Sequence, residues 1–258
     1  MRIISWNING IGKRFDELEE LAYRYRPNFI CLQKVRCNDG RDDYKIEGYR
    51  QLFNLNDYGS WSGVTTYWKI PEDAGRFPGF HSPERINDDF LSKDGHMQVF
   101  DCKDFFLVNA YVPFANKTIE GAETYRQRWN AAFQEFIKKL ASEKSVVICG
   151  DLNIVHTIKD TCDKRLEQNR PCFNKWEREN FNSLLKNCRL IDSFREINQD
   201  ANIPTFYGNY RSTGLGNRID YFLISCSLLA SVTAADILSD FGTGQSVPII
   251  LDFEDDDV

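Results

Sequence analysis

The chain has 258 residues, of which 42% are hydrophobic and 14% aromatic, and its 32 basic and 38 acidic side chains give a formal net charge of −6. This composition excludes an intrinsically disordered chain, which has few aromatic residues, and the length suits one α/β or sandwich domain. The longest apolar runs are much shorter than the roughly 20 residues of a membrane-spanning helix. We therefore expect one globular domain over residues 1–258 that does not enter a membrane.

Two features of the sequence bear on the cellular compartment. The first seven residues lack the apolar segment and cleavage site of a signal peptide, and the eight cysteines show no C-x-x-C spacing. We expect reduced thiols in a cytoplasmic protein, or in a nuclear one if the source is eukaryotic.

An acidic tail is expected at about residues 254–258, where four consecutive acidic side chains end the sequence. Removing their charge of −4 from the total of −6 leaves −2 for the rest of the chain. The composition therefore does not indicate the broad basic face that drives nonspecific binding to nucleic acid.

The first half of the chain predicts a β-α-β opening followed by several strands. An apolar run at residues 3–6 predicts a strand, apolar residues at helical spacing over 15–25 predict an amphipathic helix, and a continuous apolar run at 29–32 predicts a buried strand. Apolar runs between turns rich in Gly, Asp and Pro predict further strands at residues 49–53, 63–68, 97–102 and 105–112.

The second half predicts more helices and strands. A helix over residues 125–140 precedes a buried strand at 145–149, and another helix begins near Asn174, which Glu177 helps to cap. Two further strands, joined by a helix or a strand, are predicted at residues 218–224 and 247–253. Core positions are expected for the aromatic residues Trp129, Phe133, Trp176, Phe181 and Phe194. Runs of strands between helices favour two sheets packed face to face over a doubly wound sheet.

Polar side chains follow three of the predicted apolar runs. Asn7 and Asn9 follow the first strand, Asp151 and Asn153 follow the strand at 145–149, and Asp220 lies within a late apolar run. Carboxylate and amide oxygens that meet at one edge suit Mg²⁺ or a phosphate ester. Each residue by itself is equally consistent with a turn or a cap.

Six segments together resemble the successive motifs of the exonuclease III and abasic-site endonuclease family, within the endonuclease/exonuclease/phosphatase superfamily. These segments are residues 5–10, 31–33, 109–113, 150–156, 192–195 and 218–222. The resemblance implies an α/β fold like that of deoxyribonuclease I, a four-layered sandwich of two packed mixed β-sheets flanked by helices, with the site at one rim. Active members of the family cut phosphodiester bonds with Mg²⁺.

The resemblance also assigns roles to residues that match the motifs of the family. It implies remnant catalytic roles for Tyr111, Asp151 and Asn153. Phosphate contacts are implied for Asn7, Tyr111 and Asn153, and metal contacts for Asp151 and Asp220.

The sequence departs from the pattern of the family in three places. Lys34 replaces the metal-binding glutamate, and a protonated lysine has no lone pair with which to bind Mg²⁺. Gln245 and Ser246 stand where the terminal Asp-His pair is expected, or a two-residue deletion removes that pair, which is absent in either alignment. Asn217 replaces the tryptophan that lines the abasic-sugar pocket. We consider two interpretations of Lys34: its ammonium neutralises a carboxylate or a bound phosphate near the metal position, or it extends into solvent.

The departures lead to two hypotheses on activity. In the first, the protein is a pseudoenzyme that has lost most hydrolysis and binds DNA, RNA or a nucleic-acid-binding protein; the catabolite repression control protein, which resembles the family in fold and lacks nuclease activity, is a precedent. No tightly bound cofactor is expected. In the second, the protein is a divalent-metal-dependent phosphodiesterase of DNA repair that uses Mg²⁺ in a rearranged site, with Asp240, Asp252 or His156 replacing a lost group.

A third hypothesis is a module that binds only proteins. It is favoured if certain basic residues do not gather at the rim that carries the motifs. These residues are Arg36, Arg41, Lys69, Arg211 and Arg218.

Overall fold

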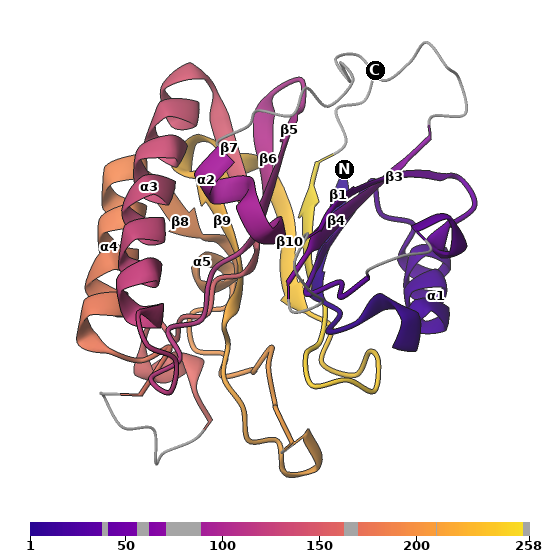
Figure 1. Cartoon of the computed structure of the whole chain (residues 1–258). Helices are drawn as coiled ribbons and strands as arrows, with labels where there is room; N and C mark the ends of the chain where they lie inside the picture. Colours follow the sequence, from indigo (N-terminus) through magenta and orange to yellow (C-terminus); the bar gives the residue numbers. More distant parts are fainter. Residues whose placement is uncertain (38–40, 56–61, 71–88, 163–169, 210, 255–258) are drawn as a thin grey trace.

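The computed structural model describes residues 1–37, 41–55, 62–70, 89–162, 170–209 and 211–254 (Figure 1). Most of the predicted acidic tail, residues 255–258, lies outside these ranges. The backbone of Arg41 is described, but its side chain is not. None of the helices in these ranges has the length and apolar character that a membrane crossing requires.

Two mixed β-sheets form the centre of the described structure. The six-stranded sheet has the order β10-β11-β1-β2-β4-β3, and the five-stranded sheet has the order β5-β6-β7-β9-β8. In the first, β1 is parallel to β2, and in the second β6 is parallel to β7, while the other neighbours are antiparallel. The strands are β1 (Arg2–Asn7), β2 (Phe29–Gln33), β3 (Tyr49–Asn54), β4 (Val64–Lys69), β5 (Met97–Asp101), β6 (Phe105–Tyr111), β7 (Ser145–Asp151), β8 (Leu190–Asp192), β9 (Asp220–Ser225), β10 (Val232–Ile237) and β11 (Ile249–Phe253).

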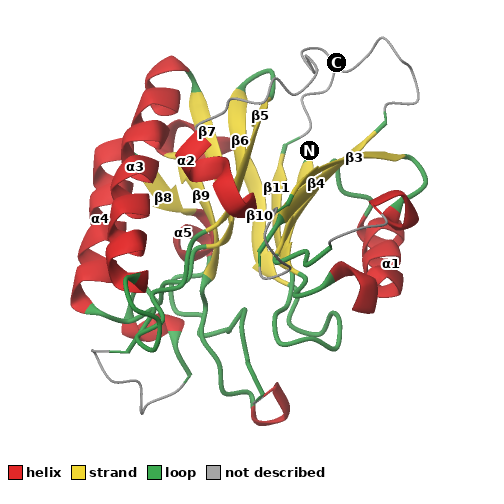
Figure 2. Cartoon of the chain, viewed as in Figure 1, coloured by secondary structure: helices red, strands yellow, loops and turns green. Residues whose placement is uncertain are grey.

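Helices cover the outer face of each sheet, which completes four layers (Figure 2). The α-helices are α1 (Phe15–Tyr25), α2 (Asp89–Ser92), α3 (Ala122–Glu143), α4 (Lys175–Cys188) and α5 (Ser193–Ile197). Short 3-10 helices occur at Ile11–Lys13, Arg41–Tyr44, Lys93–Gly95, Ile158–Asp160, Arg211–Thr213 and Cys226–Ser231. Figure 1 shows α1 beside the first sheet and α3 with α4 beside the second. The predicted α/β sandwich is confirmed.

Three hydrophobic cores lie between these four layers. Ile3 and Cys31 face the core between the two sheets, whereas Ile4 and Ile30, one position away on the same strands, face the core under α1. A third core lies between the second sheet and α3 with α4. Because both faces of the central strands are covered, these strands are continuously apolar in sequence.

Most predicted elements agree with the structure within a few residues, and several differences have a physical reason. The segment left open between the last two predicted strands contains β10. The prediction missed α2, β8 and α5, which have only 4, 3 and 5 residues and so carry no periodicity. Trp176 was predicted in the core and is only half-buried on α4. The eight cysteines are all free.

Candidate functional site

The predicted site residues lie where parallel strands of both sheets end. Asn7 ends β1 and Asp151 ends β7, and the Asn7 Nδ2 donates a hydrogen bond of 2.7 Å to Asp151 Oδ2 across the two sheets. The other oxygen of the Asp151 carboxylate accepts a hydrogen bond from the backbone N–H of Asn153 at 3.0 Å. Asp151 is fully buried. The rim thus holds a carboxylate whose two oxygens are both engaged.

Asp220 lies directly beside Asp151 because the two residues are paired in the antiparallel register of β7 and β9. Asp220 is buried, and neither of its carboxyl oxygens has a hydrogen-bond partner among the described residues. Burial, and then the negative charge of Asp151, raise the pKa of Asp220 well above its usual value. The pair therefore disfavours a second negative charge at this position.

Lys34 directs its ammonium into this carboxylate pair. It follows β2 in the left-handed region, with φ of 50°. Its Nζ lies 3.6 Å from Asp151 Oδ2 and 4.9 Å from the centroid of the Tyr111 ring, and its side chain is 19% exposed. Burial lowers the pKa of Lys34, but Asp151, Tyr111 and Asp220 together outweigh this, so the net shift is upward. The interpretation in which Lys34 extends into solvent is wrong.

His96 and Cys172, which the sequence did not indicate as site residues, contact Tyr111 and Asn153. His96 shares a hydrogen bond of 2.7 Å between its Nδ1 and the Tyr111 carbonyl oxygen, and its ring stacks on that of Tyr111 with centroids 5.5 Å apart. The Cys172 thiol donates to Asn153 Oδ1 at 3.9 Å, and Asn153 Nδ2 donates to the Val112 carbonyl oxygen at 2.8 Å. Neither His96 nor Cys172 belongs to a motif, so only folding reveals their position.

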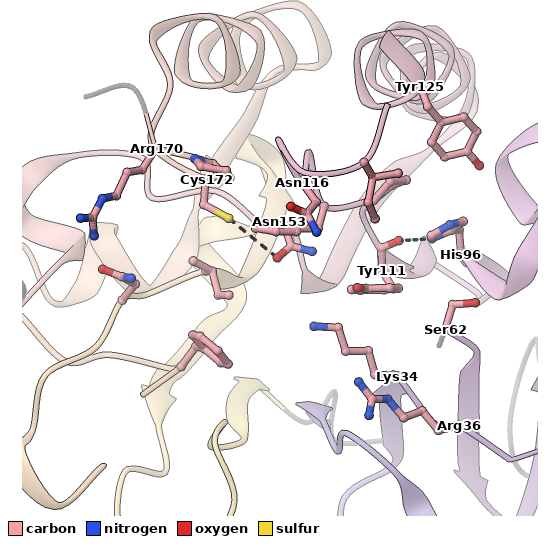
Figure 3. A pocket seen from close by; sticks show the side chains of 17 residues that line it. Lys34, Arg36, Ser62, His96, Tyr111, Asn116, Tyr125, Asn153, Arg170 and Cys172 are labelled. Carbon is pink, nitrogen blue, oxygen red and sulfur yellow. Dashed lines mark hydrogen bonds between the residues drawn. The ribbon is translucent and has the colours of Figure 1, made fainter. Parts of the chain in front are cut away.

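A cavity of about 810 Å³ opens over these residues (Figure 3). Lys34 and Arg36 approach it from the end of β2, and Arg170 lies on the opposite side of the view. The remaining lining residues are Ser62, His96, Tyr111, Pro113, Phe114, Asn116, Ile119, Tyr125, Asn153, Pro171, Cys172, Phe206, Asn217 and Ile219. The volume is in the range of sites that bind small molecules or one residue of a polymer.

Residues 4–240 match the family described as Endonuclease/Exonuclease/phosphatase. The chain belongs to this family. It is 28% identical over 257 residues to an exodeoxyribonuclease of Bacillus subtilis (strain 168), covering 97% of this chain and 98% of the relative. It is 29% identical over 262 residues to the DNA repair nuclease APEX1 of Danio rerio, covering 97% of this chain and 81% of that protein.

Solved structures of similar fold include an AP endonuclease and a 3′ phosphatase. The AP endonuclease LMAP from Leishmania major superposes with a TM-score of 0.84 at 21% identity, covering 97% of this chain and 86% of that one. The 3′ phosphatase NExo from Neisseria, bound to a product DNA hairpin, superposes with a TM-score of 0.82 at 20% identity, covering 98% and 99%. At these identities the likeness supports the fold, which is that of the family.

The donor set at the rim does not fit the Mg²⁺ site that the family implies. Both oxygens of Asp151 are engaged, and one of them lies 3.6 Å from the Lys34 ammonium. Asp220 and the Asn7 Oδ1 have no partners, but the described residues contain no group of three or more His, Cys, Asp or Glu side chains that could hold a metal ion. Mg²⁺ requires six oxygen ligands and repels an ammonium at this distance.

The residues at the expected terminal Asp-His motif form neutral contacts. Asn9 Nδ2 donates to Gln245 Oε1 at 3.2 Å, and Gln245 Nε2 donates to Asn209 Oδ1 at 3.0 Å. The Ser246 carbonyl oxygen accepts a hydrogen bond of 3.2 Å from Trp6 Nε1. Two amide hydrogen bonds therefore hold the Gln245 side chain in place, where it supplies neither a carboxylate nor an imidazole.

The residues considered as replacements for the lost groups do not line the cavity. His156 Nε2 shares a hydrogen bond of 2.7 Å with Asn182 on α4. Asp252 pairs with Arg2 at the start of β1, the opposite end of that strand from Asn7. Asp240 is exposed in the loop after β10.

Of the basic residues whose gathering at the rim the sequence left open, those with described side chains are dispersed. Arg36 lines the cavity, whereas Lys69 lines a separate depression beside α1. Arg211 donates to backbone carbonyl oxygens of residues 239, 241 and 244. Arg218 is 1% exposed and pairs with Asp160 and Asp192. Arg218 therefore serves the fold, since its guanidinium cannot reach a ligand.

Proposed function

We propose that this family member binds nucleic acid at the rim and has lost most metal-dependent phosphodiester hydrolysis. The observation that carries the proposal is the Lys34 ammonium 3.6 Å from Asp151 Oδ2. In this proposal the Lys34 ammonium is a fixed cation at the place where active members of the family bind a metal ion. The ammonium neutralises Asp151 without any metal and leaves no room for a divalent ion beside it.

Two general estimates support a large loss of rate. A metal ion contributes several kcal/mol of charge stabilisation to a reaction of this type, and a general acid or base contributes about 10² to 10⁴ in rate. The proposed site has neither the metal nor the Asp-His pair. It keeps Asn7, Tyr111 and Asn153 as groups that can contact a phosphate.

The dispersed basic residues favour a module that binds only proteins, but we propose nucleic acid as the partner because relatives are described as an exodeoxyribonuclease and a DNA repair nuclease. The cations that line the cavity, Lys34, Arg36 and Arg170, suit a phosphate backbone. The proposal leaves DNA or RNA, or a complex with a nucleic-acid-binding protein, as the physiological form.

One observation favours the alternative of a phosphodiesterase with a rearranged site. The Asp220 oxygens and the Asn7 Oδ1 are buried acceptors without partners, and such atoms are candidates for a cation. A metal held there would have to tolerate the charge of Lys34, which is why we favour the first proposal.

Hydrolysis assays on matched variants distinguish the two. Purified protein and the Asp151→Asn variant are incubated with an abasic-site duplex, a nicked duplex and a single-stranded RNA in Mg²⁺ or Mn²⁺. We expect no cleavage by the wild type above that of the variant, together with binding of at least one of these polymers that weakens steeply with salt. Cleavage that Asp151→Asn abolishes would overturn the proposal, whereas cleavage equal in both proteins would reveal a contaminant.

A further inference from the structure

The cavity has a second part, away from Lys34, with largely apolar walls. Its lining includes Pro171, Cys172, Phe206 and Ile219. Ile219 is buried in a small cluster with Val155 and Phe173, against which Cys172 and Phe206 pack. We call the part of the cavity lined by Pro171, Cys172, Phe206, Asn217 and Ile219 the recess.

The backbone around the recess is fixed in place. Phe206 and Asn217 form an isolated antiparallel bridge, with hydrogen bonds of 2.9 and 2.8 Å between their backbone N–H and C=O groups. At Gly216 an added Cβ would lie 2.6 Å from the Phe206 carbonyl oxygen, so the two segments approach more closely than any other residue permits. The recess is therefore formed before any ligand arrives.

Asn217 supplies the one amide side chain of the recess. Its Oδ1 is buried and has no hydrogen-bond partner among the described residues. The χ2 angle of Asn is broad and roughly two-fold, so a rotation of about 180° exchanges the positions of Oδ1 and Nδ2. Such an amide can accept from one ring substituent and donate to an adjacent ring atom, the edge that adenine presents to Asn in nucleic-acid complexes.

The flat apolar walls, the amide and the neighbouring cations together match a nucleotide that keeps its base. Apolar and aromatic surfaces stack on bases, and Lys34 still has ammonium protons to donate beyond Asp151. We propose that the recess binds an intact nucleobase, with adenine as the best match, while the attached phosphate lies against Lys34. This inference rests on the proposed binding of nucleic acid and specifies its ligand as a nucleotide with its base, in contrast to a base-free sugar.

Calorimetric titration with two small ligands tests the recess directly. The ligands are adenosine 5′-monophosphate and ribose 5-phosphate, which share the sugar phosphate and differ in the base. We expect the wild type to bind adenosine 5′-monophosphate at least about tenfold more tightly. Equal affinity for the two ligands, or no binding of either, would overturn the inference.

Three variants assign the effect to Asn217. We expect Asn217→Trp, which fills the recess, to reduce the affinity for adenosine 5′-monophosphate to that for ribose 5-phosphate, and Asn217→Ala to weaken it about fivefold. The control is Asn187→Ala, at an exposed position on α4, which should bind like the wild type. If Asn217→Trp, shown by thermal unfolding to be folded, binds adenosine 5′-monophosphate as tightly as the wild type, the inference is wrong.

A labelled single-stranded oligonucleotide, titrated in parallel, separates this inference from the proposed function. If the oligonucleotide binds and the two small ligands do not differ, the recess does not bind a base but the proposed function stands. If neither the oligonucleotide nor the nucleotide binds, both are wrong.

Discussion

Two clusters of buried charge, one around Arg218 and one around Lys34, have opposite properties. Around Arg218, every charged atom has a partner: Asp160 Oδ1 accepts from Arg218 and Arg195, and both oxygens of Asp192 accept from Arg218. Around Lys34, neither oxygen of Asp220 has a hydrogen-bond partner in the described part of the chain. Buried polar groups are normally satisfied, so the first cluster has the properties of a structural network and the second those of a site.

The comparison also shows what the replacement of an acid by Lys34 does to the rim. With an acid at position 34, the three neighbouring carboxylates would repel one another strongly unless a cation joined them. With Lys34, the charges of Lys34 and Asp151 already balance. The rim therefore resembles the network around Arg218 in having a paired carboxylate, Asp151, but Asp220 lacks hydrogen bonds among the described residues.

The largest expected effect in this comparison is that of Asp160→Asn. Asp160 accepts hydrogen bonds from Arg218, Arg195 and Thr157, and removing one member of a buried charged network typically costs 3–5 kcal/mol. We expect a loss of about 3 kcal/mol in the free energy of unfolding at pH 7, measured in urea. A loss below about 1 kcal/mol would show that the network does not stabilise the fold.

The stability that Asp160→Asn loses relative to the wild type should depend on pH. Burial raises the pKa of Asp160, but Arg218, Arg195 and Thr157 outweigh this and hold it below its usual value. Stability from a carboxyl with a lowered pKa is complete above the unfolded pKa of about 3.9 and is lost as the pH falls through the lower folded value. The difference between wild type and Asp160→Asn should therefore be constant from pH 7 to 5 and shrink below about 4.

A smaller effect of the opposite sign is expected for Asp220→Asn. Because Asp220 has no partners and faces Asp151, its neutral isostere should raise the free energy of unfolding at pH 7 by about 1 kcal/mol or leave it unchanged. The pKa of Asp220 is raised, so this gain should disappear as the pH falls to about 3, where both states are protonated. Destabilisation similar to that of Asp160→Asn would mean that Asp220 has a partner in solution, such as a cation.

Much of the fold could be predicted from the sequence because burial dictates its pattern. β1 and β2 are covered on both faces and read as continuous apolar runs, and α1 is amphipathic because only one side packs on a sheet. The short elements α2, β8 and α5 could not be predicted, because their packing on neighbours, more than their own pattern, determines their structure.

The candidate site could be predicted in part. Asn7 and Asp151 came together as expected because β1 and β7, which they end, belong to two sheets that pack face to face. The inward direction of Lys34 depends on a backbone φ of 50° that the sequence does not reveal. The burial of Arg218 depends on Asp160 and Asp192, which are distant in sequence, so the sequence could not reveal that Arg218 is buried in an ion-pair network.

The central claim is that the Lys34 ammonium takes the place of a divalent ion beside Asp151. Electron paramagnetic resonance of Mn²⁺ titrated into the wild type, Lys34→Glu and the matched neutral variant Lys34→Gln measures this occupancy without relying on activity. We expect one bound Mn²⁺ per chain in Lys34→Glu and none in the wild type. One Mn²⁺ bound by the wild type and released by Asp220→Asn would contradict the account.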